Sequence, residues 1–289
     1  AQITGDGLPS SIKKLRIENS TGVALTSGTA VSDTVHLVSG DLDLNGNTLT
    51  LGALGYLRET TGNSVVGTSG TITTTRTLTI PTGDDIAGLG VAITSAADLG
   101  STVIARGHAV QGGTSIRRYF DISPTLNSAL NATLVFKYNG GELAGKDEAT
   151  LELWKSADVG INWDKQGGTV DTLANIITLS GINSFSRWSA TDAVHSLYST
   201  FTFAVSNGWN MISVPITTPD YRKVILFPTA KSNAFAFQNG YVAKDTLVNG
   251  AGYWLKFDAN QNVPMYGGAR NSDSVNVSAG WNMIGSVSS

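Results

Sequence analysis

The sequence predicts an all-β protein in three parts: a β-solenoid-like or small β region at the N-terminus, an antiparallel β-sandwich, and a C-terminal β-rich module. Three observations predict this class. Short apolar runs alternate with polar residues at the period of a strand. Turn residues, among them many of the 33 glycines, separate these runs. A strand-like motif, Gly-Trp-Asn-Met-Ile, occurs twice in the last third of the chain.

Residues 1–85 contain the shortest strands. Runs such as 35–38 and 49–51 alternate Leu or Val with polar residues and end at turns such as Asn45-Gly46-Asn47. Because they recur every 7 to 12 residues or so with the same chemistry, they are typical of successive rungs of a β-solenoid. A small sandwich would give the same pattern, so both folds stay open here. Residues 81–85 are expected to close the region as a turn.

Residues 86–193 carry longer and more widely spaced strands, which predict a sandwich. The expected strands are 91–94, 102–105, 116–122, 133–138, 150–155 and 176–179. Tryptophans 154, 163 and 188 are expected to supply its core. The alternation of strand side chains puts Trp154 on the same face as Glu152, which predicts a half-buried tryptophan.

Residues 194–289 contain the internal repeat. Residues 208–212 and 280–284 both read Gly-Trp-Asn-Met-Ile, and each copy follows an alternating run, 200–205 and 274–277. The second copy comes close to the end of the chain, where the first continues into Val214-Pro215-Ile216. We expect a second unit that has been started and not finished.

Composition excludes several classes of protein. With 19 Lys and Arg against 22 Asp and Glu, the net charge is −3 and only 14% of residues are charged. A nucleic-acid binder needs a basic excess, and a disordered chain needs high charge with low hydrophobicity. The absence of cysteine excludes disulfides, zinc–thiolate sites and cysteine nucleophiles.

The chain also offers predictions about location. No apolar run approaches the roughly 20 residues of a membrane span, so no transmembrane segment is expected. The sequence begins at Ala1-Gln2 without Met, as after signal-peptide removal, and a trimmed chain would look the same. We expect an extracellular or cell-surface protein.

One loop resembles half of a calcium-binding loop. Asp41, Asp43 and Asn45 alternate oxygen-bearing side chains before Gly46. Position twelve of such a loop would be Gly52 instead of Glu or Asp, and leucines on both sides describe strands. A structural Asn-Gly turn is the favoured interpretation, and bound calcium is the alternative.

No catalytic group is predicted. His36, His108 and His195 lie in three different parts of the chain, and no nucleophile elbow, phosphate loop or dinucleotide motif occurs. We therefore expect no enzyme, no catalytic residue and no cofactor. Spatial pairs of carboxylates cannot be read from sequence.

Aromatic residues gather in the last part of the chain, and two interpretations compete. An exposed row could stack sugar rings. The favoured alternative places Trp209 and Trp281 at strand starts in a core or interface. The residues concerned are Trp209, Tyr241, Tyr253, Trp254, Tyr266 and Trp281.

Several motifs resemble modules of a known group of proteins, the very large secreted surface proteins of Bacteroidota and Chlorobi bacteria. Residues 120–124, 131–134, 163–171 and 184–188 are similar to their β-sandwich module, residues 208–215, 239–241 and 250–257 to the module that follows it, and 42–51 to the repetitive strands that precede both. The resemblance implies a cell-exterior location and modular β structure, and no shared reaction.

The expected function is structural: a subunit that assembles with copies of itself, or with neighbouring modules, into a surface filament or layer. Unpaired strand edges recruit partners by strand addition. The assembly strand lies in 274–287 and is represented by Val275, Val277, Trp281, Met283 and Ile284. Residues 1–11 are the other candidate donor. The rival function is a carbohydrate-binding or adhesive module of a larger secreted protein, with polysaccharide as its partner.

Overall fold

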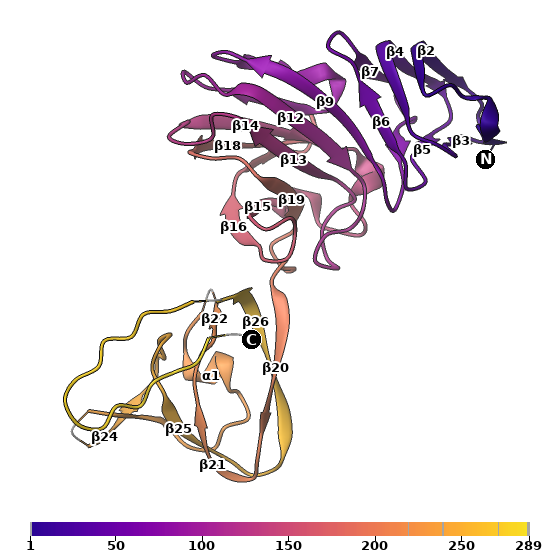
Figure 1. Cartoon of the computed structure of the whole chain (residues 1–289). Coiled ribbons are helices and arrows are strands. Elements are labelled where there is room, and N and C mark those ends of the chain that lie inside the picture. Colours follow the sequence, from indigo (N-terminus) through magenta and orange to yellow (C-terminus); the bar gives the residue numbers. More distant parts are fainter. Residues whose placement is uncertain (1, 219, 239, 271, 288–289) are drawn as a thin grey trace. The chain divides into compact units, whose positions relative to one another are not determined.

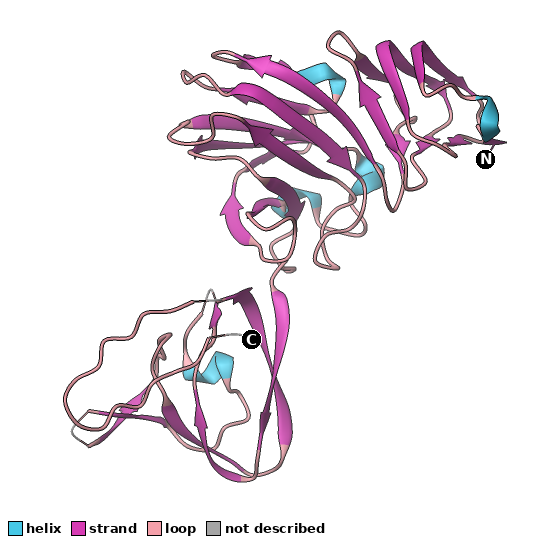
Figure 2. Ribbon diagram, viewed as in Figure 1, coloured by secondary structure: helices cyan, strands magenta, loops and turns pink. Residues whose placement is uncertain are grey.

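A computed structural model of the chain describes residues 2–218, 220–238, 240–270 and 272–287. It divides into two compact units, residues 1–197 and 198–289, which are described separately. Both are built from strands, and in the described residues the only α-helix is α1 (Lys223–Leu226) in the second unit (Figure 2). The all-β prediction is confirmed. The boundaries predicted at residues 85 and 193 stay predictions.

The first unit begins with a β-solenoid of two parallel sheets (Figure 1). One sheet has the order β1-β3-β5-β8, and in the other β9, β6, β4 and β2 lie side by side, with β7 also paired to β4. The strands are β1 (Gln2–Ile3), β2 (Ser11–Glu18), β3 (Val23–Ala24), β4 (Thr29–Ser39), β5 (Leu42–Asp43), β6 (Thr48–Leu51), β7 (Tyr56–Glu59), β8 (Val65–Val66) and β9 (Thr71–Leu78).

The coil length decides between the two folds that the sequence left open. Val23 pairs with Leu42, 19 residues on, and Leu42 pairs with Val65, 23 residues on, in parallel register. Parallel pairing at this spacing makes each coil one rung, as in a solenoid and not in a small sandwich. The inward residues of successive coils stack into one core, as the paired and fully buried Leu42 and Val65 do.

The N-terminal residues already belong to this solenoid. Gln2 and Ile3 pair with Val23 and Ala24, and Ser11 begins β2. Ala1 lies outside the described residues. Residues 2–11 are therefore part of the first coil.

Antiparallel strands follow in the same unit. Strand β9 of the solenoid pairs with β12, so the larger sheet continues as β9-β12-β13-β19-β15-β16, and a second sheet has the order β10-β11-β14-β18-β17. Their strands are β10 (Thr82–Asp85), β11 (Val91–Thr94), β12 (Gly100–Gly107), β13 (Tyr119–Pro124), β14 (Ala132–Lys137), β15 (Glu152–Ser156), β16 (Asp164–Gly167), β17 (Thr169–Asp171), β18 (Ile176–Ile182) and β19 (Arg187–Thr191). Short 3₁₀ helices are η1 (Gly5–Gly7), η2 (Ile86–Gly88), η3 (Gly140–Glu142) and η4 (Glu148–Thr150).

The two antiparallel sheets share a core. Phe120 of β13 meets Phe136 of β14 edge to face, with ring centroids 5.0 Å apart. Tryptophans 154, 163 and 188 are all buried, as predicted. The expectation that Trp154 is half-buried is wrong, because β15 is covered on both faces and leaves Trp154 only 2% exposed.

Sequence reasoning missed some strands of this part. Residues 81–85, expected as a closing turn, contain edge strand β10, all four of whose residues are exposed. A strand without a buried face has no apolar alternation, so it leaves no periodic signal. The same holds for β16, which has no buried residue.

The second unit contains two further sheets. One has the order β20-β26-β22 and the other β21-β25-β23-β24. The strands are β20 (Ser199–Val205), β21 (Gly208–Ile212), β22 (Ile216–Thr217), β23 (Ala234–Phe237), β24 (Tyr241–Lys244), β25 (Tyr253–Phe257) and β26 (Gln261–Ala269). Tyr253, Leu255 and Phe257 point inward from β25 into the core of this unit, as predicted.

The alternating run before the second copy of the repeat does not form a strand. Residues 274–277 lie outside any strand, and the segment after them is held by an isolated bridge between Ala251 and Ile284 and by the Ser286 amide, which donates to the Ser213 hydroxyl at 3.2 Å. The Gly252 amide donates to the Met283 carbonyl at 3.0 Å, and the Gly285 amide donates to the Gly250 carbonyl at 2.9 Å. Among the described residues, no strand pairs with residues 274–277, so their alternation is not part of any sheet.

Candidate functional site

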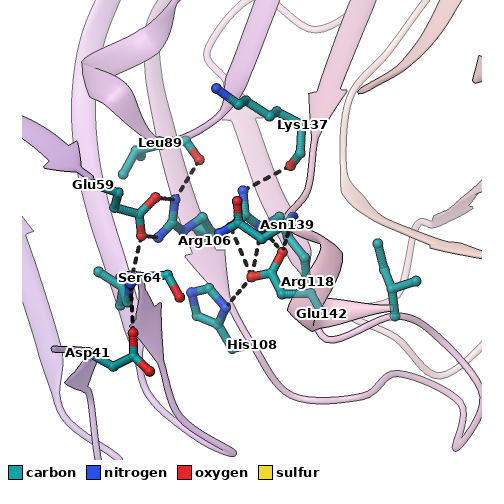
Figure 3. A network of polar contacts seen from close by, with 12 residues as sticks. Asp41, Glu59, Ser64, Leu89, Arg106, His108, Arg118, Lys137, Asn139 and Glu142 are labelled. Carbon is teal, nitrogen blue, oxygen red and sulfur yellow. Dashed lines mark hydrogen bonds and ion pairs between the residues drawn. The ribbon is translucent and has the colours of Figure 1, made fainter. Parts of the chain in front are cut away.

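The first unit contains a polar groove of about 1320 Å³. Its walls come from solenoid residues 56–68 and from sandwich loops at 88–90, 108–118 and 137–142. A cluster of buried charged side chains lies along it (Figure 3). We call this cluster, formed by Glu59, Arg106, His108, Arg118 and Glu142, the ion cluster.

The first half of the ion cluster joins the solenoid to the sandwich. The guanidinium of Arg106, with 0% exposure, donates to both carboxylate oxygens of Glu59, at 3.1 and 2.5 Å. It also donates to the Leu89 carbonyl at 3.1 Å. Glu59 ends β7 and Arg106 lies near the end of β12, so the ion pair connects the two folds within this unit.

The second half is centred on Glu142. Its Oε1 accepts from Nη2 of Arg118 at 2.9 Å and lies 3.0 Å from Nδ1 of His108. Its Oε2 accepts from the Asn139 amide at 2.9 Å, which fixes the short helix η3. All three charged or titratable side chains are buried, so the carboxylate is held by partners on every side.

The balance of burial and charge sets the protonation of these groups. Burial acts to raise the pKa of Glu142, but the charge of Arg118 and the hydrogen bond with His108 outweigh it and hold that pKa at about 2. Burial lowers the pKa of His108, helped by the charges of Arg106 and Arg118. The cluster therefore contains an ionised Glu142 beside a neutral imidazole at pH 7.

Strand geometry explains how these residues meet. Thr102, Ile104 and Arg106 occupy alternate buried positions along β12, and His108 continues this alternation just after the strand. Strand β13 pairs with β12 so that Arg106 is opposite Phe120, which brings Arg118 to the same end. A charged residue at an inward position of an alternating strand was the signal that sequence reasoning could have used.

The residues of the predicted calcium loop hold the corners of the solenoid. Asp41 Oδ1 accepts from the Ser64 amide and Asp43 Oδ1 accepts from the Asn45 amide, both at 2.8 Å. Asn45 Nδ2 donates to the Leu25 carbonyl of the preceding coil at 3.0 Å. In the described residues no group of three His, Cys, Asp or Glu side chains is arranged for a metal ion. Calcium binding stays an untested alternative, and each of the three side chains already has a backbone partner.

The three histidines lie apart, as the sequence indicated. His108 belongs to the ion cluster, His195 pairs with Asp192 three residues before it, and His36 lies half-buried in β4. The described residues contain no helix long and apolar enough to cross a membrane.

The aromatic residues of the second unit divide between core and surface. Tyr253 is buried and Trp254 is half-buried, whereas Tyr241 and Tyr266 are exposed. Trp209 lies near the start of β21, as predicted, but its side chain is 53% exposed. Its ring centroid is 6.1 Å from that of Phe235. Trp281 is 90% exposed and lies outside any strand. Neither tryptophan packs into the core of this unit, so of the favoured interpretation only the interface remains, and it stays a prediction.

Both copies of the repeat build the same turn. In the first copy, Asn210 Oδ1 accepts from the Ser206 amide at 2.9 Å and Nδ2 donates to the Ser206 carbonyl at 2.8 Å. In the second, Asn282 makes the same two bonds with Ser278, at 3.0 and 2.8 Å. The glycine inside each turn has nearly the same left-handed φ, 97° and 98°. The sequence repeat is thus also a repeat of structure, because both copies form the same hydrogen-bonded turn.

The surroundings of the two turns differ. After the first turn, β21 pairs along its whole length with β25, from Gly208 opposite Phe257 to Ile212 opposite Tyr253. After the second, residues 283–285 meet residues 250–252 at an isolated bridge, and Val275, Val277 and Trp281 are exposed. We call residues 274–287 the C-terminal segment.

Comparisons with protein families, characterised proteins and solved structures find no match for this chain. What the structure supports of the resemblance described above is its coarse part, a β-solenoid of about three coils followed by several antiparallel sheets.

Proposed function

We propose that the protein is a structural subunit of an extracellular assembly, and that copies of the chain join by β-strand addition through the C-terminal segment. The observation that carries this proposal is the second Gly-Trp-Asn-Met-Ile copy, which forms its turn without a sheet around it. The exterior setting rests on the sequence resemblance and on the low charge of the chain.

The exposed side chains of the C-terminal segment favour a partner. Trp281 is 90% exposed, Val277 66% and Ile284 57%. Covering a large apolar side chain stabilises a protein by about 1.5 to 3 kcal/mol. A segment of alternating sequence that lies outside any sheet and leaves apolar residues uncovered is what strand addition uses.

A second copy supplies a suitable acceptor. Strands β21 and β24 are the two edges of the four-stranded sheet, and β24 carries the exposed residues Tyr241 and Val242. An incoming strand that pairs with β24 would place apolar residues beside these two side chains. Because each copy has one such edge and one C-terminal segment, the contact is head-to-tail and builds a filament unless the rotation closes a ring.

Sedimentation velocity and electron microscopy of the purified full chain test the proposal. We expect concentration-dependent oligomers and filaments, and we expect deletion of residues 274–289 to leave a folded monomer. Trp281→Ala is expected to raise the concentration needed for assembly about tenfold or more, since it removes roughly 2 kcal/mol of burial.

Leu173→Asp provides a matched control, because Leu173 is an almost fully exposed apolar residue of the first unit, outside the C-terminal segment. It should leave assembly unchanged. Assembly that persists after deletion of 274–289, or a full chain that stays monomeric at every concentration, would show that the C-terminal segment is not the connector.

A further inference from the structure

We propose that the polar groove of the first unit binds a neutral, hydroxyl-rich ligand, a segment of an oligosaccharide chain. This site is separate from the C-terminal segment and does not depend on assembly. The groove volume of about 1320 Å³ exceeds the roughly 300 to 1,000 Å³ of pockets that hold one small ligand, so it has room for several sugar rings.

The charges along the groove select a neutral ligand. Five carboxylates face four basic side chains in its lining: Asp41, Asp43, Glu59, Asp85 and Glu142 against Arg58, Arg117, Arg118 and Lys137. A polyanion such as nucleic acid requires a basic excess, and a polycation requires an acidic one. Sugar hydroxyls both donate and accept, so they match a lining that contains both kinds of group.

One buried acceptor lies beside the groove without a hydrogen-bond partner. His108 lines the groove and is 5% exposed, and its Nδ1 is engaged by Glu142. When Nδ1 carries the proton and donates it to the carboxylate, Nε2 keeps a free lone pair. Nε2 has no partner among the described residues. Figure 3 shows the ring turned from Glu142 toward the side of Ser64, another lining residue. This nitrogen is covered by its neighbours, so a ligand hydroxyl supplies the missing donor once the groove lining moves slightly aside.

The groove also has an aromatic wall. Tyr56 of β7 is 46% exposed and lies among the lining residues. Gly88, another lining residue, packs directly against it: an added Cβ there would lie 2.9 Å from the Tyr56 ring and 2.0 Å from the Leu57 carbonyl oxygen. The glycine thus lets the backbone approach Tyr56 closely, and the free face of the ring can stack on the apolar face of a sugar.

The floor of the groove is rigid, which suits recognition. Arg118 donates to the Lys137 carbonyl at 2.9 Å as well as to Glu142, so its guanidinium is fixed at both ends. Buried, mutually bonded side chains lose little further freedom when a ligand binds. Binding by a preformed surface keeps most of the interaction free energy as affinity.

Isothermal titration calorimetry of the full chain tests this site with linear hexasaccharides of glucose, xylose and mannose, and with dextran sulfate as the anionic comparison. We expect at least one neutral hexasaccharide to bind and dextran sulfate to bind more weakly. No binding of any neutral hexasaccharide at millimolar concentration overturns the proposal, and so does tighter binding of dextran sulfate.

Two further readouts place the ligand. Tyr56→Ala should weaken binding about 3- to 10-fold, by the size of a lost aromatic contact, whereas Tyr241→Ala, a matched exposed tyrosine of the second unit, should not. The imidazole ¹⁵N signal of His108 Nε2 should shift on saturation with the bound hexasaccharide. Equal effects of the two tyrosine variants, or an unchanged His108 signal, contradict the assignment. Deletion of residues 274–289 should leave this binding intact, which separates failure of the groove from failure of assembly.

Discussion

Glu142 has a role that its position at the end of the short helix η3 would not suggest. Its carboxylate accepts hydrogen bonds from Arg118 and from the backbone of Asn139, and it contacts His108, all in a buried environment. A buried charge is costly unless its partners compensate it. The stability of the sandwich beside the solenoid therefore depends on this one ionised side chain.

Replacing Glu142 with Gln should destabilise the first unit by about 3 to 5 kcal/mol, because Arg118 would then be a buried charge without its carboxylate. Chemical denaturation at pH 7 measures this loss. Glu148→Gln is the control, since Glu148 accepts from the Tyr138 hydroxyl and, among the described residues, forms no ion pair. Equal losses for the two variants would contradict a special role for Glu142.

The depressed pKa of Glu142 also predicts a pH dependence. The pKa of Glu142 is about 2 in the folded chain and near 4.3 in the unfolded chain. Ionisation of this carboxyl therefore adds to the free energy of unfolding above pH 4.3, and the added stability disappears as the pH falls toward 2. The loss is about 3 kcal/mol, and Glu142→Gln should lack it. Denaturation midpoints of both proteins between pH 5 and 2 measure the difference. Parallel curves would contradict the assignment.

His108 also makes the folded chain less stable as the pH falls, but at a higher pH than Glu142 does. Burial keeps its folded pKa below the ordinary value near 6.5, so the unfolded chain takes up a proton that the folded chain resists. This contribution lowers stability as the pH falls below about 6.5.

At the scale of elements, the corners of the solenoid depend on glycine. Gly40 has φ 83°, and an added Cβ would lie 1.8 Å from the Asn19 carbonyl oxygen of the preceding coil. Gly62 has the same φ of 83° with nothing within 4 Å of the added atom. Comparing Gly40 with Gly62 therefore separates two effects of an added side chain: the clash with the preceding coil, and the strain of a left-handed backbone.

Gly40→Ala should destabilise the first unit by about 3 kcal/mol or more, while Gly62→Ala should cost about 1 kcal/mol, the strain of a left-handed alanine. Thermal or urea unfolding of the two variants gives the comparison. Similar losses would mean that the coils do not pack as closely as the structure has them.

The two asparagine turns lead to an element-scale prediction as well. Asn210→Ala should destabilise the second unit by about 1 to 2 kcal/mol, because two hydrogen bonds of the turn before β21 are lost. Asn282→Ala removes the equivalent bonds from a turn without a sheet, so monomer stability should not change while assembly weakens. Unfolding curves and sedimentation of both variants test this contrast. A stability loss for Asn282→Ala in the monomer would contradict it.

At the scale of the whole molecule, local periodicity was enough to predict the class. Alternating leucines with Asn and Gly at the corners indicated the solenoid, and the buried tryptophans indicated the sandwich core. What could not be predicted depends on contacts distant in sequence. Glu59 and Arg106 are 47 residues apart, and only the parallel coils and the antiparallel sheet bring them together.

The groove shows the same limit. Its lining combines solenoid corners with loops after β12 and β14, and no local pattern relates these segments. The exposure of Trp209 could not be predicted either, because strand alternation shows which residues share a face but not which face is covered. The repeat, in contrast, was visible in sequence, and the structure adds that its two copies build the same turn in different surroundings.

Amide hydrogen exchange across residues 274–287, measured at low and high concentrations of the full chain, is the most direct test of assembly through the C-terminal segment. Our account predicts fast exchange in the dilute protein and protection at high concentration, together with protection of edge strand β24. Exchange that is fast in 274–287 at every concentration, or oligomers that form without protection there, would contradict it.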